Sequence, residues 1–141
     1  MLFGKRERLI RRILIVEDEP LVAFDNEHML ADAGYEVVAT VDSFAAAAEV
    51  IESEQIDLVL ADITLAGDGD GFDVARAAAA KGIAVLVVTG DCGEEAKNIA
   101  LGCLAKPYSE KVLLGALVAL DAHLRGKRPK RLPEQLTLWV A

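Results

Sequence analysis

Five short apolar runs, each followed by a stretch with helical periodicity, constrain the fold of this chain more than any other feature. The first and fourth runs are continuous and rich in β-branched residues, as in parallel strands that are buried on both faces. Strands that alternate with helices predict an α/β fold of the (βα)5 type, a doubly wound parallel five-stranded sheet with helices on both faces. The five expected strands lie at residues 12–16, 36–40, 57–61, 83–88 and 102–105.

Capping residues separate these runs from the helical stretches. Ser43 and Ser109 are candidate N-caps, and Gly34 and Gly82 are suited to ending helices. Pro20 suits the first turn of the first helix. One helix is expected to start after Ser43, and the others are expected at about 20–33, 72–81, 94–101 and 109–124.

Length and composition indicate one globular domain. The chain has 141 residues, of which 53% are hydrophobic, and this is enough for one sizeable core. No apolar stretch is long enough to cross a bilayer, and the first residues do not resemble a secretory signal. Two cysteines, Cys92 and Cys103, suggest no disulfide framework. We therefore expect a cytoplasmic protein that makes no membrane contact.

Charge is distributed in blocks along the chain. Residues 13–124 hold 21 acidic and five basic residues, a balance that disfavours nucleic-acid binding by the core. Basic residues gather near both ends. The expected organisation is therefore a basic N-terminal extension over 1–11, a folded domain over 12–124, and a tail over 125–141 with no output domain.

The tail is basic at its start and apolar at its end. Leu136, Leu138 and Val140 alternate with other residues, which is typical of a strand. One interpretation is that this segment packs against its own domain or against a second copy of the chain. A disordered tail is the alternative.

Polar residues stand where the apolar runs end. In a parallel sheet of this kind, ligands bind beyond the carboxyl ends of the strands. Converging carboxylates repel unless a cation lies between them, and Mg²⁺ prefers such hard oxygen ligands. A lysine and a threonine beside the metal could hold the oxygens of a phosphoryl group, with an aspartate as its acceptor. The residues at these positions are Glu17, Asp18, Asp62, Thr89 and Lys106.

Four motifs in this order resemble the receiver domain of two-component response regulators, a CheY-like domain with a flavodoxin-like fold. They are "ILIVEDEP", "DLVLADITLAGDGDGFDVA", "VLVVTG" and "AKPY". The resemblance covers residues 11–124 and implies that Asp62 is the phosphoacceptor. It also implies contacts of Thr89 and Lys106 with the phosphoryl group, and a cis peptide bond before Pro107.

The resemblance further implies a cofactor and partners. Mg²⁺ would be bound by Glu17, Asp18, Asp62 and the backbone carbonyl of Thr64. Phosphate would come from phosphohistidine on a histidine kinase or a histidine phosphotransfer protein. The chain would catalyse only its own phosphorylation and dephosphorylation, so it is not expected to be an enzyme in the usual sense. It would act on an unknown downstream protein, and a homodimer is left open.

Two departures from the family pattern concern the switch. Cys103 stands where many receivers have an aromatic residue, three positions before Lys106. The stretch from Thr89 to Lys106 is also short, so the fourth helix is expected to be reduced or irregular.

Other interpretations stay open at this stage. The chain could be a phosphate sink, or a receiver-like interaction module that is never phosphorylated. A Mg²⁺-dependent phosphatase with an aspartate nucleophile would need a second aspartate where Thr64 stands, so it is disfavoured. Asp68 and Asp70 do not fit an EF-hand loop and are interpreted as turn formers, with Asp70 also a candidate N-cap.

Overall fold

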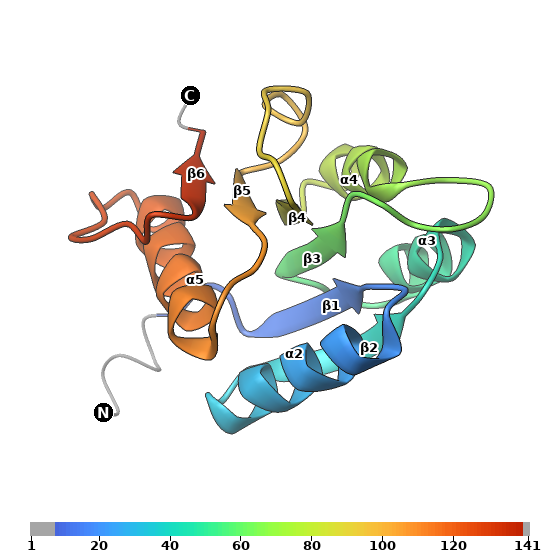
Figure 1. Cartoon of the computed structure of the whole chain (residues 1–141), viewed down its shortest axis with the longest axis horizontal. Coiled ribbons are helices and arrows are strands. Elements are labelled where there is room, and N and C mark those ends of the chain that lie inside the picture. Colours follow the sequence, from blue (N-terminus) through green and yellow to red (C-terminus); the bar gives the residue numbers. More distant parts are fainter. Residues whose placement is uncertain (1–7, 140–141) are drawn as a thin grey trace.

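A central sheet with helices on both faces dominates the computed structural model, which describes residues 8–139 (Figure 1). The predicted strands and most of the predicted helices are present. The elements in chain order are β1 (Arg12–Val16), α2 (Pro20–Asp32), β2 (Glu36–Val41), α3 (Phe44–Ser53), β3 (Leu58–Asp62), α4 (Gly71–Ala80), β4 (Ala84–Thr89), β5 (Gly102–Ala105), α5 (Glu110–Leu124) and β6 (Leu136–Leu138).

The strand order is β2-β1-β3-β4-β5-β6. The first five strands of the chain pair in parallel, which confirms the predicted doubly wound sheet. The chain leaves β1 for β2 on one side and later places β3 on the other side of β1. The strand order therefore reverses between β1 and β3, and such folds bind ligands at this point.

The sixth strand belongs to the tail. β6 pairs antiparallel with β5 and places Leu136 opposite Leu104. Gly102 permits this approach, because a Cβ atom there would lie 2.7 Å from the carbonyl oxygen of Thr137. The tail thus packs against its own domain and extends the sheet beyond the predicted domain boundary at residue 124. Val140 and residues 1–7 of the predicted basic extension lie outside the described residues.

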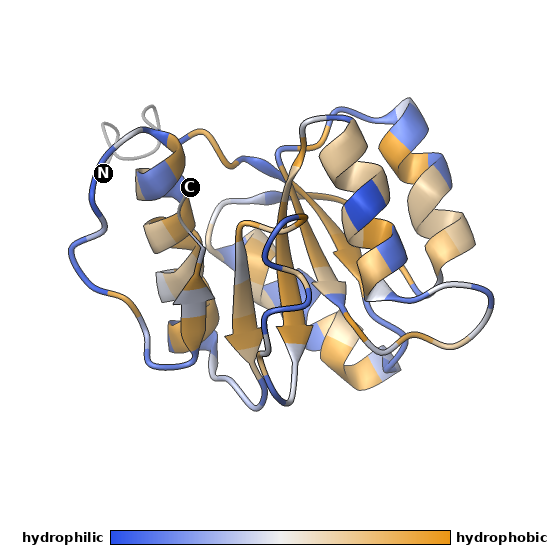
Figure 2. Cartoon of the chain, turned by 90° about the horizontal axis from the view of Figure 1, so that it is seen from above, coloured by the Kyte–Doolittle hydropathy of each residue, from blue (hydrophilic) through white to orange (hydrophobic). Residues whose placement is uncertain are grey.

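Each face of the sheet has its own apolar core. Ile13 and Ile15 of β1 point to the face covered by α2 and α5, while Leu14 and Val16 point to the face covered by α3 and α4. All four side chains are fully buried, which explains why β1 is a continuous apolar run. Figure 2 shows the hydrophobic strands between the helices.

The predicted helix caps are confirmed. The hydroxyl of Ser43 accepts a hydrogen bond from the amide of Ala46, and that of Ser109 accepts one from Val112. At the start of α4, Asp70 and Asp73 exchange hydrogen bonds between side chain and backbone, which is a capping box. No helix among residues 8–139 is both long and apolar enough to span a membrane.

The helix predicted over 94–101 is wrong. This segment forms successive turns, with short-range hydrogen bonds such as that from the amide of Lys97 to the carbonyl of Glu94. Only residues 90–101 are available to return the chain from the end of β4 to the start of β5. The expectation of a reduced or irregular fourth helix is therefore confirmed.

The two cysteines were expected to give no disulfide framework, but Cys92 and Cys103 form a disulfide with each other. Parallel pairing of β4 with β5 places Cys103 opposite Val87. The short loop that returns the chain from β4 to β5 brings Cys92 close to Cys103 of β5. The disulfide therefore ties the loop after β4 to β5, at the position where many receivers carry an aromatic side chain.

Candidate functional site

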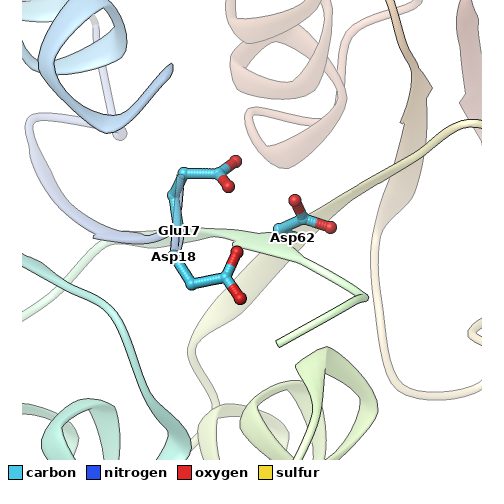
Figure 3. A group of neighbouring side chains, drawn as sticks. All are labelled: Glu17, Asp18 and Asp62. Carbon is cyan, nitrogen blue, oxygen red and sulfur yellow. The ribbon is translucent and has the colours of Figure 1, made fainter. Parts of the chain in front are cut away.

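Three carboxylates meet at the carboxyl edge of the sheet, where β1 and β3 end (Figure 3). Glu17 and Asp18 directly follow β1, and Asp62 is the last residue of β3. The pairing of Val16 with Ala61 brings these strand ends together. One oxygen of each carboxylate lies within 4.8 Å of an oxygen of the other two. Glu17 and Asp62 are only 4% and 6% exposed, so this cluster is held largely away from water.

Backbone amides of the adjoining loops orient each carboxylate. Glu17 accepts a hydrogen bond from the amide of Glu19 at 3.1 Å, and Asp62 accepts one from the amide of Thr64 at 3.0 Å. Asp18 accepts one from the amide of Ala66 at 3.1 Å, which ties the loop after β3 to the end of β1. The positions of the oxygens are therefore fixed by the loops as well as by the strands.

Lys106 supplies the positive charge of the site. Its Nζ atom donates a hydrogen bond to Asp62 Oδ2 at 2.6 Å and lies 3.7 Å from Glu17 Oε1. The Lys106 amide donates to the carbonyl of Thr89 at 2.8 Å, which fixes the loop after β5 to the end of β4. The peptide bond between Lys106 and Pro107 is cis, as the resemblance implies.

The pKa values in the site reflect burial and crowding. Burial raises the pKa of Glu17 from its ordinary 4.5 to about 7; the Glu19 amide and Lys106 oppose this rise, and Asp62 adds to it. Partial burial lowers the pKa of Lys106, but the hydrogen bond and charge of Asp62 outweigh this effect and raise it. The negative charges of Asp62 and Glu17 thus repel each other, and Lys106 lies close to both carboxylates.

The cluster is suited to a small divalent cation. Mg²⁺ binds oxygen at about 2.0–2.1 Å, so two oxygens on the same ion lie at most about 4.2 Å apart. Oxygens that already lie within 4.8 Å of one another need only small side-chain rotations to reach that geometry. The acidic group of Glu17, Asp18 and Asp62 therefore fits Mg²⁺ in both donor type and spacing.

The two threonines of the predicted site lie beside this cluster. Thr89 ends β4, the strand next to β3, and is half-buried. Thr64 is exposed, and its amide contacts Asp62 as described above. All the predicted site residues thus lie at one edge of the sheet, while the roles of the Thr89 hydroxyl and the Thr64 carbonyl stay predictions.

Gly71 is a positioning residue that the sequence analysis treated only as part of a turn. A Cβ atom at this position would overlap the carbonyl oxygen of Asp62 and would lie 2.5 Å from Cα of Ile63. The Gly71 amide donates to the carbonyl of Ile63 at 2.8 Å. The first residue of α4 is therefore packed directly on the backbone that carries the phosphoacceptor candidate.

Asn26 and Tyr108 were also not identified from the sequence. Asn26 is 3% exposed, and its side-chain oxygen accepts a hydrogen bond from the Tyr108 hydroxyl at 3.2 Å. This bond joins α2 to the loop that carries Lys106. In the sequence, Asn26 stands at helical spacing between the apolar residues Val22 and Leu30, which was the one available signal, since a polar residue at a buried helix position needs a partner.

Comparison with known proteins gives the same picture. The family model "Response regulator receiver domain" matches residues 13–118. The transcriptional regulatory protein PdtaR of Mycobacterium tuberculosis is 37% identical over 121 residues, which are 82% of this chain and 58% of PdtaR. The phyllosphere-induced regulator PhyR of Methylorubrum extorquens is 40% identical over 62 residues, which are 43% of this chain and 23% of PhyR. This chain thus spans little more than half the length of PdtaR.

Solved receiver structures share the fold. A CheY-like receiver domain protein from Methanospirillum hungatei is 28% identical with a TM-score of 0.73, over 83% of this chain and 98% of that one. The receiver domain of the sensor histidine kinase PA1611 from Pseudomonas aeruginosa is 26% identical with a TM-score of 0.66, over 77% and 94% of the two chains. That structure has a magnesium ion coordinated in the active site cleft. The match over residues 13–118, together with the acidic cluster at the sheet edge, shows that this chain belongs to the response regulator receiver domain family, a family of signalling modules.

Proposed function

We propose that Asp62 accepts a phosphoryl group from phosphohistidine on a histidine kinase or a histidine phosphotransfer protein. The observation that carries the proposal is the buried Asp62 carboxylate, which lies in a metal-ligand cluster with Glu17 and Asp18 and accepts a 2.6 Å hydrogen bond from Lys106. A carboxylate at a strand end, with a candidate metal site on one side and a lysine on the other, has the parts that phosphoryl transfer requires.

The metal of this site would be Mg²⁺, held by Glu17, Asp18, Asp62 and the carbonyl of Thr64. When bound, it would neutralise charge on the phosphoryl oxygens. The chain's own residues carry out the rest. An Asp62 oxygen attacks phosphorus, the bond from phosphorus to the imidazole nitrogen of the donor breaks, and the imidazole leaves with its electron pair and takes up a proton.

The product brings new charge to the sheet edge. Lys106 already lies on Asp62 and would follow the phosphoryl oxygens, and the Thr89 hydroxyl would donate a second hydrogen bond. The Lys106 amide is hydrogen-bonded to the carbonyl of Thr89, and a disulfide joins Cys92 to Cys103. These movements would therefore be transmitted to the return loop between β4 and β5. The signal is then a shift between two arrangements of this region.

One experiment tests this function directly. The protein is incubated with Mg²⁺ and acetyl phosphate, and its intact mass is measured over time. We expect one phosphoryl adduct, no adduct with Asp62→Asn, and none when Mg²⁺ is chelated. Asp68→Asn is the matched control, because it removes an exposed carboxylate from the loop after β3 and should leave the adduct unchanged.

The same experiment separates the alternatives. Turnover of unrelated phosphoesters would favour a phosphatase, although Thr64 stands where that chemistry requires a second aspartate. Failure to form an adduct with acetyl phosphate or with a phosphorylated kinase would favour a module that is never phosphorylated. An adduct that returns rapidly to the kinase's histidine, without binding a further protein, would favour a phosphate sink.

A further inference from the structure

A groove lies between α5 and the loop that joins α5 to β6. We call this loop, residues 126–135, the strap (Figure 1). The strap runs back along α5 because β6 must pair antiparallel with β5. The space between them has a volume of about 760 Å³, which is in the range of ligand sites. Its floor is one face of α5, formed by the small residues Val112, Gly115, Val118, Ala119 and Ala122.

The shape of the groove depends on a few short side chains. Gly115 has no side chain, and Pro133 of the strap approaches it so closely that a Cβ atom on Gly115 would lie 3.4 Å from Pro133 Cγ. Val118 is 60% exposed, an unusual fraction for a valine on a helix that packs against a sheet. The floor is therefore apolar and is exposed at Val118, whereas Pro133 packs over Gly115 and Ala119 is buried.

The rim of the groove is formed by basic residues, most of which have no ion-pair partner within residues 8–139. Within residues 8–139, eight basic residues have a hydrogen bond, an ion pair or a ring contact, among them Arg12, Lys81 and Arg125. The other five have no such partner in that range, and all five line this groove. They are Lys111, Lys127, Arg128, Lys130 and Arg131.

This charge pattern selects an anionic occupant. The chain as a whole has a net charge of −8, so acidic side chains were available to pair with the rim. Five exposed cations instead surround an apolar floor, and Figure 2 shows the strap as mostly hydrophilic beside α5. An occupant that matches both features carries apolar side chains on one face and carboxylates on its flanks.

We infer that the groove between α5 and the strap binds an acidic amphipathic helix of a partner protein. The apolar anchors of that helix would lie on the floor around Val118, and its flanking carboxylates would pair with the rim lysines and arginines. Single-stranded nucleic acid fits less well, because it is bound on aromatic platforms and the described lining contains no aromatic residue.

A second copy of this chain is the main competing occupant. Its α2 exposes Leu21 and Phe24 at 80% and 59% and has acidic residues but no lysine or arginine. Such a contact joins two different surfaces, so it closes into a dimer only when both grooves are filled reciprocally and otherwise continues head to tail. The test therefore follows the oligomeric state as well as binding.

The probe is a fluorescent peptide of about four helical turns with leucines on one face and glutamates on both flanks. Fluorescence anisotropy measures its binding to the full chain, and the same peptide with glutamine in place of glutamate is the control probe. We expect a micromolar Kd for the acidic peptide, at least tenfold weaker binding of the glutamine peptide, and a loss of affinity with added salt.

Matched protein variants locate the contact. Lys127→Gln with Lys130→Gln removes two cations from the rim, and Arg76→Gln with Lys81→Gln removes two exposed cations from α4 and its C-terminal end. Both pairs change the net charge equally. The rim pair should weaken binding about tenfold and the α4 pair less than twofold. Val118→Glu should abolish binding, whereas Asp62→Asn should leave it unchanged, so failure here is separate from failure of the proposed function.

Three results would overturn the inference. One is the absence of binding by the acidic peptide. Another is equal weakening by the rim pair and the α4 pair, because this would mean attraction by overall charge. The third is evidence for another occupant. Either an oligonucleotide of equal charge displaces the peptide, or the chain sediments as an oligomer that Val118→Glu dissociates.

Discussion

Reduction of the Cys92–Cys103 disulfide should lower the free energy of unfolding of this domain by about 3 kcal/mol. The bond closes a loop with a sequence separation of 11, and the chain-entropy model gives about 3 kcal/mol for a loop of this length at 25 °C. The native state itself changes little, because Cys103 is only 1% exposed and a buried thiol packs as a small apolar group. The loss therefore comes mainly from the greater freedom of the reduced unfolded chain.

Urea unfolding of the oxidised and the reduced protein measures this difference. Trp139, the single tryptophan, is a suitable reporter, since its amide donates to the carbonyl of Leu101 at the end of the return loop. Alkylation and intact mass establish the state of the thiols in each sample. For a domain of this size the loss corresponds to a fall of roughly 10 °C in Tm.

Cys92→Ser is the matched variant. It keeps the buried Cys103 and changes only the half-buried partner, so its stability should equal that of the reduced wild type. Reductant should then have no further effect on it. A difference below about 0.5 kcal/mol between oxidised and fully reduced wild type would refute the reasoning. Free thiols in the protein as purified under air would refute the pairing itself.

Three further predictions concern the carboxylate cluster. Gly71→Ala should cost about 1–3 kcal/mol in urea unfolding and slow phosphorylation by acetyl phosphate, because a methyl group there overlaps the Asp62 backbone; Gly90→Ala, with open space around it, should do neither. Lys106→Ala should destabilise the Mg²⁺-free protein by about 1–3 kcal/mol at neutral pH, because it leaves the buried carboxylates without a positive charge. Mg²⁺ should restore most of this loss, and equal losses with and without Mg²⁺ would contradict the prediction. In the Mg²⁺-free protein, the contribution of Glu17 to stability should be largest below its unfolded pKa of 4.5 and should be lost as the pH rises through its folded pKa of about 7; urea unfolding of the wild type should therefore show a decline with pH that Glu17→Gln lacks, and parallel curves would speak against it.

The sequence was sufficient to predict the fold and the place of the site. Apolar runs such as Ile13–Val16 are local signals, and their alternation with helices leaves few topologies other than a parallel sheet. Because parallel strands end at one edge, Glu17 and Asp62 could be placed together although 45 residues separate them in the chain. The positions of the acidic cluster and of Lys106 were therefore predictable from the residues that follow each run.

The features that the sequence did not reveal depend on distances between segments. The helical pattern at 94–101 was overridden because the loop had to return to β5 within a dozen residues, and the same return brought Cys92 to Cys103. The requirement for glycine at position 71 arises only where α4 meets the backbone of Asp62.

The division follows from the range of the forces involved. Periodicity, caps and strand-end chemistry depend on neighbouring residues, so the sequence by itself determined the five parallel strands, most of the helices and the acidic edge. The close approach of two backbone segments, or the lining of one groove by two segments, depends on packing between parts that are distant in the chain. Only the tertiary structure therefore placed β6 beside β5, and only it showed that the five unpaired cations line one apolar groove.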